Sequence, residues 1–335
     1  MKVAFFSAKP YEREAFEALD HDHEITYLEE RLTETTAHRC QGHRAVSVFT
    51  NDILDATVIH TLAREGCEVI ALRCAGCNHV DFDAADETGM RVVHVPAYSP
   101  HAVAEHAVAL MMAVIRHVHR AADRVRNGNY ALHGLTGFDV VGKTVGVIGT
   151  GRIGTAFARI LGQGFRARVI AHDPAPNRAC REMGVEYTSL GSLLDQSDII
   201  ALHCPLTEQS HHLIDAEAIA AMKPGVVLVN TARGGVIDTL AVIDGLKSGR
   251  VGALAIDVYE HEGPLFFEDR SDEILKDDTF ARLLTFHNVL ITGHQAFLTH
   301  DALEQIARQT VANLTCIETG AACEREITPA DLQAD

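Results

Sequence analysis

The stretch VIGTGRIG, residues 147–154, decides the fold of this 335-residue chain. Its glycines, Gly149, Gly151 and Gly154, stand directly between an apolar strand-like run and a helix-compatible segment. At such a turn the first glycine permits a tight bend, the second lets a pyrophosphate approach the backbone, and the third lets helix and strand pack closely. The context favours a dinucleotide-binding turn over its alternative, a generic turn between a strand and a helix.

A carboxylate follows the glycines at the spacing that a dinucleotide site requires. Asp173 closes the next strand-like run, RVIAHD. Its side chain can accept hydrogen bonds from the hydroxyls of an adenosine ribose, and its charge would repel a 2'-phosphate. The sequence therefore predicts NAD, and not NADP, as the cofactor.

Strand-like and helix-compatible segments alternate from Lys143 onward. The apolar runs are KTVGVIG, ARVIAHD, DIIALHCPL, GVVLVNTARG, GALAIDVY and NVLITGH. Alternation of this kind, with nearly continuous apolar strands, predicts a parallel sheet covered by helices on both faces. We expect an α/β fold whose NAD-binding part is a doubly wound, Rossmann-like domain.

Shorter β-rich runs before residue 98 predict a second, smaller α/β domain. Ser99 and Pro100 then supply a cap and a first-turn proline for a helix that is apolar on most faces through its first half. Such a helix is expected to be buried, within its own chain or against another subunit. We therefore predict a homodimer or a higher homo-oligomer.

Composition excludes several partners. Lys+Arg 29 against Asp+Glu 46 give a formal charge of -17, which repels nucleic acids and anionic membrane surfaces. No run approaches a membrane span, and the N-terminal run lacks the length and cleavage pattern of a signal peptide. The 8 dispersed cysteines indicate a reducing compartment, so we expect a cytoplasmic protein without nucleic-acid or membrane partners.

Three further residues follow successive strand-like runs. Arg233 comes after GVVLV, Glu262 lies in DVYEHEGP, and His294 follows NVLIT. Arginine can hold a carboxylate through two hydrogen bonds, although a surface salt bridge is an equal alternative for the residue alone. A histidine with an ordinary pKa of about 6.5 can protonate a ketone oxygen at neutral pH, and a neighbouring carboxylate favours its charged form. The set predicts reduction of a keto acid.

Across nearly its whole length the chain resembles the D-isomer-specific 2-hydroxyacid dehydrogenases, and among them the fermentative D-lactate dehydrogenases. The resemblance rests on RCAGCNHVD (73–81), VPAYSPHAVAEHA (95–107), GTGRIG, HCPLT, NTARGGVID, DVYEHEGPLFFEDRSD and GHQAFLT. It implies a substrate domain with a flavodoxin-like fold, formed by residues 1–100 plus 298–335, and an NAD-binding domain formed by residues 101–297.

The resemblance also implies roles for individual residues. Arg233 would bind and polarise the substrate, His294 would exchange the proton, and Glu262 would hold and tune His294. The backbone amides of Ala75 and Gly76 would bind the substrate carboxylate, and Tyr98 and Phe297 would enclose a small side chain. Phe49 stands where relatives often carry tyrosine. The positions implied for the cofactor are Gly149, Gly151, Arg152, Ile153, Gly154, Asp173, Cys204, Pro205, Thr231, Ala232 and Asp257, with Ser210 less securely matched.

The implied activity is the reversible, NADH-dependent reduction of pyruvate to D-lactate. Another 2-keto acid, such as hydroxypyruvate, glyoxylate or a bulkier homologue, is an alternative substrate. A non-catalytic NAD sensor or corepressor on the same fold is an alternative of another class.

No metal site is expected from the sequence. Cys74 and Cys77 have the spacing of a redox or zinc pair, but no second pair completes a tetrahedral site. The histidines of residues 210–212 and 21–23 lack further ligands in register, which favours a solvated surface.

Overall fold

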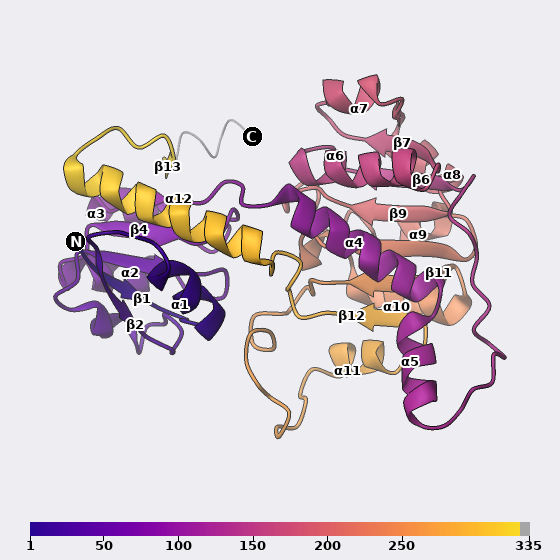
Figure 1. The fold of residues 1–335 in the computed structure, drawn as a ribbon, viewed down its shortest axis with the longest axis horizontal. Helices are drawn as coiled ribbons and strands as arrows, with labels where there is room; N and C mark the ends of the chain where they lie inside the picture. The colour runs from indigo at the N-terminus through magenta and orange to yellow at the C-terminus, as the bar shows by residue number, and fades with distance from the viewer. Residues whose placement is uncertain (329–335) are drawn as a thin grey trace. The chain divides into compact units, whose positions relative to one another are not determined.

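The computed structural model describes residues 1–328, which fold into two compact units (Figure 1). Met1–Ser99 and residues 297–328 form one of them, here called the terminal unit. Pro100–Ala296 form the other, the central unit. Among residues 1–328, no helix has both the length and the apolar character needed to cross a membrane.

The central unit is built on a seven-stranded sheet in which every pair of neighbouring strands is parallel. The strand order is β12-β11-β10-β9-β6-β7-β8. This is the doubly wound order, which reverses between β6 and β9, and it confirms the predicted fold. The strands are β6 (Thr144–Ile148), β7 (Arg168–His172), β8 (Glu186–Tyr187), β9 (Ile199–Leu202), β10 (Val226–Asn230), β11 (Val251–Ile256) and β12 (Val289–Ile291).

Helices cover both faces of this sheet because successive strand residues point to opposite sides. Val147 of β6 packs into the core beneath α4 and α6, whereas Ile148 packs into the core on the other face. The first face carries α4 (Pro100–Ile115), α6 (Arg152–Arg159) and α7 (Arg178–Glu182), and the second carries α8 (Leu190–Gln196), α9 (Ala216–Ala221), α10 (Thr239–Ser248) and α11 (Asp278–Leu284).

The rest of the central unit consists of short elements between these layers. Helix α5 (Val118–Arg126) follows α4, a π-helical turn (Ile160–Gly164) extends α6, and a 3-10 turn (Gly234–Val236) follows β10. This last turn begins directly after Arg233, so it fixes the backbone next to a proposed substrate-binding residue.

The terminal unit has a six-stranded sheet of order β13-β5-β4-β3-β1-β2. Its first five strands in chain order are parallel in the flavodoxin-like order 2-1-3-4-5, as predicted, and β13 pairs antiparallel with β5. Its strands are β1 (Lys2–Phe5), β2 (Glu24–Tyr27), β3 (Ala45–Val48), β4 (Val69–Leu72), β5 (Arg91–Val93) and β13 (Glu326–Ile327).

The helices of the terminal unit are α1 (Pro10–Glu17), α2 (Ala56–Arg64), α3 (Phe82–Thr88) and α12 (His300–Thr319), with a 3-10 turn at Ala37–Cys40. The long helix α12 brings the C-terminal part of the chain back onto the sheet formed by the N-terminal part (Figure 1). It begins at a Thr299 cap, whose hydroxyl accepts from the Ala302 amide, and ends where Gly320 adopts a positive φ of 72°.

Candidate active site

The glycine turn after β6 has the geometry that a dinucleotide cradle needs. Gly149 has a φ of 91°, and a Cβ there would lie 2.6 Å from the backbone carbon of His203. A Cβ on Gly154 would lie 2.0 Å from the carbonyl oxygen of Gly149, whereas a Cβ on Gly151 would meet nothing within 4 Å. The first and third glycines are thus needed for packing, and the second leaves open space before α6, where Arg152 and Ile153 form the first turn.

Asp173 lies over this turn. One of its carboxylate oxygens accepts hydrogen bonds from the backbone amide (2.6 Å) and the hydroxyl (2.9 Å) of Thr150. The Thr150 hydroxyl accepts in turn from Tyr187 (2.8 Å), and the Asn177 amide group donates to the Thr150 carbonyl (2.9 Å). Thr150 was missed in the sequence, although its hydroxyl between two glycines of the motif was the available signal.

The loop after β9 holds three of the predicted cofactor residues. Cys204 is half-buried, and burial raises the pKa of its thiol to about 11, so it is a neutral thiol at physiological pH. Pro205 is exposed, and its carbonyl accepts from the hydroxyl of Ser210 (2.6 Å), which closes the loop on itself. The neighbouring His203 has a buried Nε2 without a hydrogen-bond partner among residues 1–328, and burial lowers its pKa to about 4.

Arg233 stands just beyond the carboxyl end of β10. The Asn230 side chain shapes this turn, because its amide group donates to the Arg233 carbonyl (2.9 Å) and its oxygen accepts from the Ala232 amide (2.9 Å). Thr231 is buried. The half-exposed guanidinium of Arg233 donates to the Ala232 carbonyl (2.7 Å), and no carboxylate of residues 1–328 forms an ion pair with it. Within residues 1–328, Arg233 therefore does not form the surface salt bridge that was the alternative to carboxylate binding.

His294 and Glu262 come together from loops that follow neighbouring parallel strands. The Nδ1 atom of His294 lies 2.7 Å from one carboxylate oxygen of Glu262, whose other oxygen accepts from the Tyr259 amide (2.8 Å). The side chains are 16% and 24% exposed, so both are largely shielded from water. A carboxylate can only accept, so Nδ1 carries a hydrogen and the imidazole presents Nε2 to the outside of the pair.

Asp257 fixes the backbone around His294. It is fully buried, and its carboxylate accepts hydrogen bonds from the Thr292 hydroxyl (2.5 Å) and from the amides of Gln295 (2.9 Å) and Ala296 (2.8 Å). Its carbonyl accepts from the His294 amide (2.7 Å), which helps to hold that residue at a φ of 53°. Burial alone would raise the pKa of the Asp257 carboxyl. The hydrogen bonds from His106, Thr292 and the two amides outweigh this effect, so the pKa lies below its ordinary value.

The structure thus gives Asp257 a role as a positioning residue for the segment that carries His294. His106 of α4 takes part, because its Nε2 lies 3.1 Å from the Thr292 hydroxyl and 3.4 Å from Asp257. Neither His106 nor Thr292 was singled out in the sequence. Nothing in their local pattern shows that residues 106, 257 and 292 meet.

The substrate-binding residues predicted in the terminal unit fall into two groups. The backbone amides of Ala75 and Gly76, just past the end of β4, have no hydrogen-bond acceptor within residues 1–328. Unpaired amides of this kind are available to an anion. The rings of Tyr98 and Phe297 lie 6.2 Å apart, and Phe49 lies 5.4 Å from Phe297, so these aromatic side chains form one cluster.

One group of potential metal ligands lies in the described part of the chain. It consists of His211, His212 and Glu260, whose ligand atoms lie within 4.8 Å of one another. The histidines of residues 210–212 were expected to lie on a solvated surface without further ligands. The structure instead brings a third potential ligand to them, Glu260, which lies 48 residues after His212 in the chain. Cys74 and Cys77 are not part of a three-ligand group among residues 1–328.

Comparison with known proteins bears directly on this arrangement. A family model described as the NAD binding domain of D-isomer specific 2-hydroxyacid dehydrogenases matches residues 108–296. The D-lactate dehydrogenase of Escherichia coli (strain K12) is 49% identical over 329 residues, which cover 98% of this chain and all 100% of that protein. The apo structure of the E. coli enzyme has a TM-score of 0.89 to this fold at 47% identity, covering 98% of this chain and 100% of that one.

Two further solved structures are similar. A structure of the pyruvate reductase of Chlamydomonas reinhardtii has a TM-score of 0.90 at 43% identity and covers 97% of this chain and 98% of its own. A D-lactate dehydrogenase from Aquifex aeolicus, complexed with NAD and lactic acid, has a TM-score of 0.83 at 32% identity, with 99% and 96% covered.

Proposed function

Because this chain belongs to the D-isomer specific 2-hydroxyacid dehydrogenase family, we propose that it catalyses the reversible reduction of pyruvate to D-lactate with NADH. It is an NAD-dependent dehydrogenase of a small 2-hydroxy or 2-keto acid. The observation that carries the proposal is the hydrogen bond between His294 and Glu262, which orients a histidine for proton exchange.

NADH, when bound, supplies a hydride to the carbonyl carbon of the keto acid. The glycine turn and Asp173 fit such a cofactor, because Gly151 leaves space for a pyrophosphate and the Asp173 carboxylate is fixed beside it by Thr150. We assign the remaining cofactor positions to the first turn of α6 and to the loops that follow β9, β10 and β11. They are Arg152, Ile153, Cys204, Pro205, Ser210, Thr231, Ala232 and Asp257.

His294 is the proposed acid in the reduction and the proposed base in the oxidation. Its Nδ1 is held by Glu262, so Nε2 is the atom that gives a proton to the developing alkoxide or takes one from the hydroxyl. The Glu262 carboxylate also stabilises the imidazolium that is present before reduction and after oxidation. Asp257 maintains the backbone position from which the imidazole acts.

Arg233 is the proposed ligand of the substrate carboxylate. Its guanidinium carries a full positive charge without an acidic partner in residues 1–328, so it provides the local positive charge that an anion needs on a chain of net charge -17. The unpaired amides of Ala75 and Gly76 are proposed to bind the same class of group. The cluster of Tyr98 and Phe297 favours a small apolar side chain, such as the methyl group of pyruvate.

The proposal is tested with a panel of 2-keto acids and NADH, including pyruvate, hydroxypyruvate, glyoxylate and 2-ketoisocaproate. We expect the highest kcat/KM with pyruvate. A higher kcat/KM with another keto acid would identify that acid as the preferred substrate. If none of the keto acids supported NADH oxidation, an NAD-binding protein without catalytic activity would be favoured.

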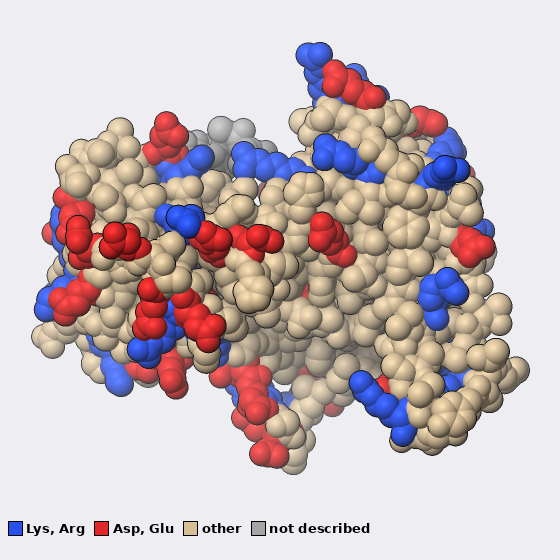
Figure 2. Space-filling model, in the orientation of Figure 1, with Lys and Arg blue, Asp and Glu red and all other residues tan. Residues whose placement is uncertain are grey.

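We also propose that the chain forms at least a homodimer, although α4 alone does not carry this prediction. The first half of α4 is buried against its own sheet and α6, through residues such as Ala104 and Ala107. Apolar surface remains exposed beside it on α5, at Val118 (55% exposed) and Val125 (54% exposed). In the face shown in Figure 2, the surface over α4 carries few charged side chains.

A second copy of this chain is the occupant that this surface favours. Arg116 and Arg126 line the groove between α4 and α5, and the chain as a whole is acidic, so a copy can supply complementary charge. Light scattering should report at least a dimer, and Val118→Asp with Val125→Asp should weaken it. A stable monomer at micromolar concentration would remove this proposal. A cytoplasmic location likewise stays a prediction.

A further inference from the structure

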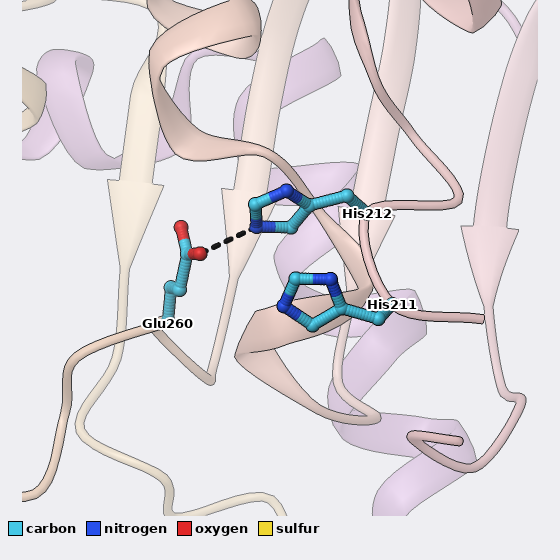
Figure 3. A group of neighbouring side chains, drawn as sticks. All are labelled: His211, His212 and Glu260. Atoms are coloured by element: carbon cyan, nitrogen blue, oxygen red, sulfur yellow. Dashed lines mark hydrogen bonds and ion pairs between the residues drawn. The ribbon is translucent and has the colours of Figure 1, made fainter. Parts of the chain in front are cut away.

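The His211, His212 and Glu260 side chains gather at one point of the central unit, outside the proposed proton-transfer pair. The histidines lie in the loop that follows β9, and the glutamate lies in the loop that follows β11 (Figure 3). One nitrogen or oxygen atom from each of the three lies within 4.8 Å of the others. Two imidazoles and a carboxylate are a ligand set that divalent transition metals bind.

The backbone positions of these residues are fixed by hydrogen bonds. The His211 amide donates to the Thr207 carbonyl (2.9 Å), and the His212 amide donates to the Gly235 carbonyl (2.8 Å). Gly234 lies against the third residue, because a Cβ there would approach the amide nitrogen of Glu260 to 2.4 Å. The turn after β10 therefore holds the two ligand-bearing loops at a set distance from each other.

The Glu260 carboxylate is oriented by a hydrogen bond from Thr239, a residue outside the group of three potential ligands. One oxygen accepts from the Nε2 of His212 (2.5 Å), and the other accepts from the hydroxyl of Thr239 (3.0 Å). Hydrogen bonds to a ligating carboxylate fix its direction and are a common feature of protein metal sites. With Thr239 in place, one Glu260 oxygen stays directed at the histidines, as Figure 3 shows.

The His211 ring is the adaptable member of the group. It is exposed and stacks on His212 with ring centroids 4.0 Å apart and planes at 22°. A metal must lie near the plane of each imidazole that binds it, so one of two stacked rings has to turn. No hydrogen bond from residues 1–328 holds the His211 ring, and a rotation about its side-chain bonds meets this need.

We propose that His211, His212 and Glu260 bind one divalent transition metal ion of the zinc class. Three protein ligands leave a fourth tetrahedral position for water. Magnesium and calcium are poor candidates, because these ions require mainly oxygen ligands and the group offers two nitrogens. Since the ion would join the loop after β9 to the loop after β11, it should bind the folded protein and stabilise it.

The test is a titration of Zn²⁺ into the purified, reduced protein by isothermal calorimetry, together with thermal unfolding with and without Zn²⁺. His211→Gln is the informative variant, because it removes a ligand without breaking any hydrogen bond of the described structure. Glu260→Gln is the second variant, in which the amide oxygen can still accept from Thr239. His133→Gln, at an exposed histidine outside the group, is the matched control.

We expect one tight Zn²⁺ site and a Zn²⁺-dependent rise in Tm for the wild type and for His133→Gln. Both cluster variants should bind at least tenfold more weakly and lose most of the rise in Tm. Binding of equal strength in all four proteins would place the metal elsewhere, for example at thiols, and would overturn the proposal, as would the absence of tight binding in the wild type. No substrate or NADH is present, so the result is independent of the proposed enzymatic activity.

Discussion

The Nδ1 atom of His294 lies 2.7 Å from a carboxylate oxygen of Glu262, and this hydrogen bond joins residues that are 32 positions apart in the chain. Glu262 is itself held by the Tyr259 amide, and His294 by the Asp257 carbonyl. The pair is therefore placed by backbone contacts on both sides. This relationship selects the tautomer of His294 and underlies the pH dependence expected of the enzyme.

Replacement of Glu262 by Gln should change how the reaction depends on pH. Reduction of pyruvate requires protonated His294, whereas oxidation of lactate requires the neutral form, so the two directions should have opposite pH profiles. The Glu262 charge stabilises the imidazolium. In Glu262→Gln, kcat/KM for pyruvate should begin to fall at a lower pH than in the wild type. An unmoved alkaline limb would show that Glu262 does not tune His294.

Replacement of Arg233 by Lys should not be conservative. An ammonium group keeps the charge but cannot make the two parallel hydrogen bonds that a guanidinium gives a carboxylate. We expect KM for pyruvate to rise and kcat to fall, with kcat/KM lower by a factor on the order of 100, equivalent to about 2.7 kcal/mol. NADH binding, measured by fluorescence titration, should persist. Near-normal turnover would remove Arg233 from the substrate site.

Asp173 should control the choice between NADH and NADPH. Its carboxylate is held beside the glycine turn by Thr150, where it would meet the ribose hydroxyls and repel a 2'-phosphate. The wild type should have a much higher kcat/KM with NADH than with NADPH. In Asp173→Ser the ratio of these two values should move closer to one. Thr150→Val serves as a matched variant that loosens the carboxylate without removing its charge. Equal use of both cofactors by the wild type would contradict this assignment.

His203 should make the folded state less stable as the pH falls. Burial lowers its pKa to about 4, while the unfolded chain binds the same proton with the ordinary histidine pKa of 6.5. Between these values the unfolded state holds more protons, so the free energy of unfolding decreases with decreasing pH. From about pH 7 to about pH 5, His203 should account for a loss of about 2 kcal/mol.

His203→Phe is the variant that measures this contribution. A phenyl ring fits beside Phe157, whose ring centroid lies 4.9 Å from that of His203, and it carries no titratable nitrogen. Denaturant unfolding of wild type and variant at the two pH values gives the difference directly. Other histidines with lowered pKa values, such as His94, are common to both proteins and cancel. Equal pH dependence would show that His203 binds its proton as readily in the folded state as in the unfolded state.

Much of the central fold could be predicted because its signals are local. Gly149 and Gly154 mark their turn by residue type, and the apolar strands such as Val226–Asn230 are buried on both faces, so each reads as a continuous run. The strands β2, β8 and β13 were not predicted. They are two to four residues long, are partly exposed and lack a comparable apolar run.

From the sequence, the placing of side chains near one another could be predicted only where strand order determines it. Arg233, Glu262 and His294 each follow a strand, so a parallel sheet brings them to one edge. Contacts that depend on side-chain direction could not be predicted in this way. The network of Asp257 with His106 and Thr292 is one example, and the meeting of Glu260 with His211 and His212 is another, because each joins loops whose sequences carry no shared pattern.

His294 is proposed to transfer the proton in the NADH-dependent reduction of pyruvate to D-lactate. The most direct measurement is NADH oxidation with pyruvate by the wild type and by His294→Gln, followed by chiral analysis of the lactate that forms. We predict D-lactate from the wild type, and loss of most of kcat in His294→Gln with NADH binding retained. L-lactate as the product, or near-normal turnover without the imidazole, would contradict the account.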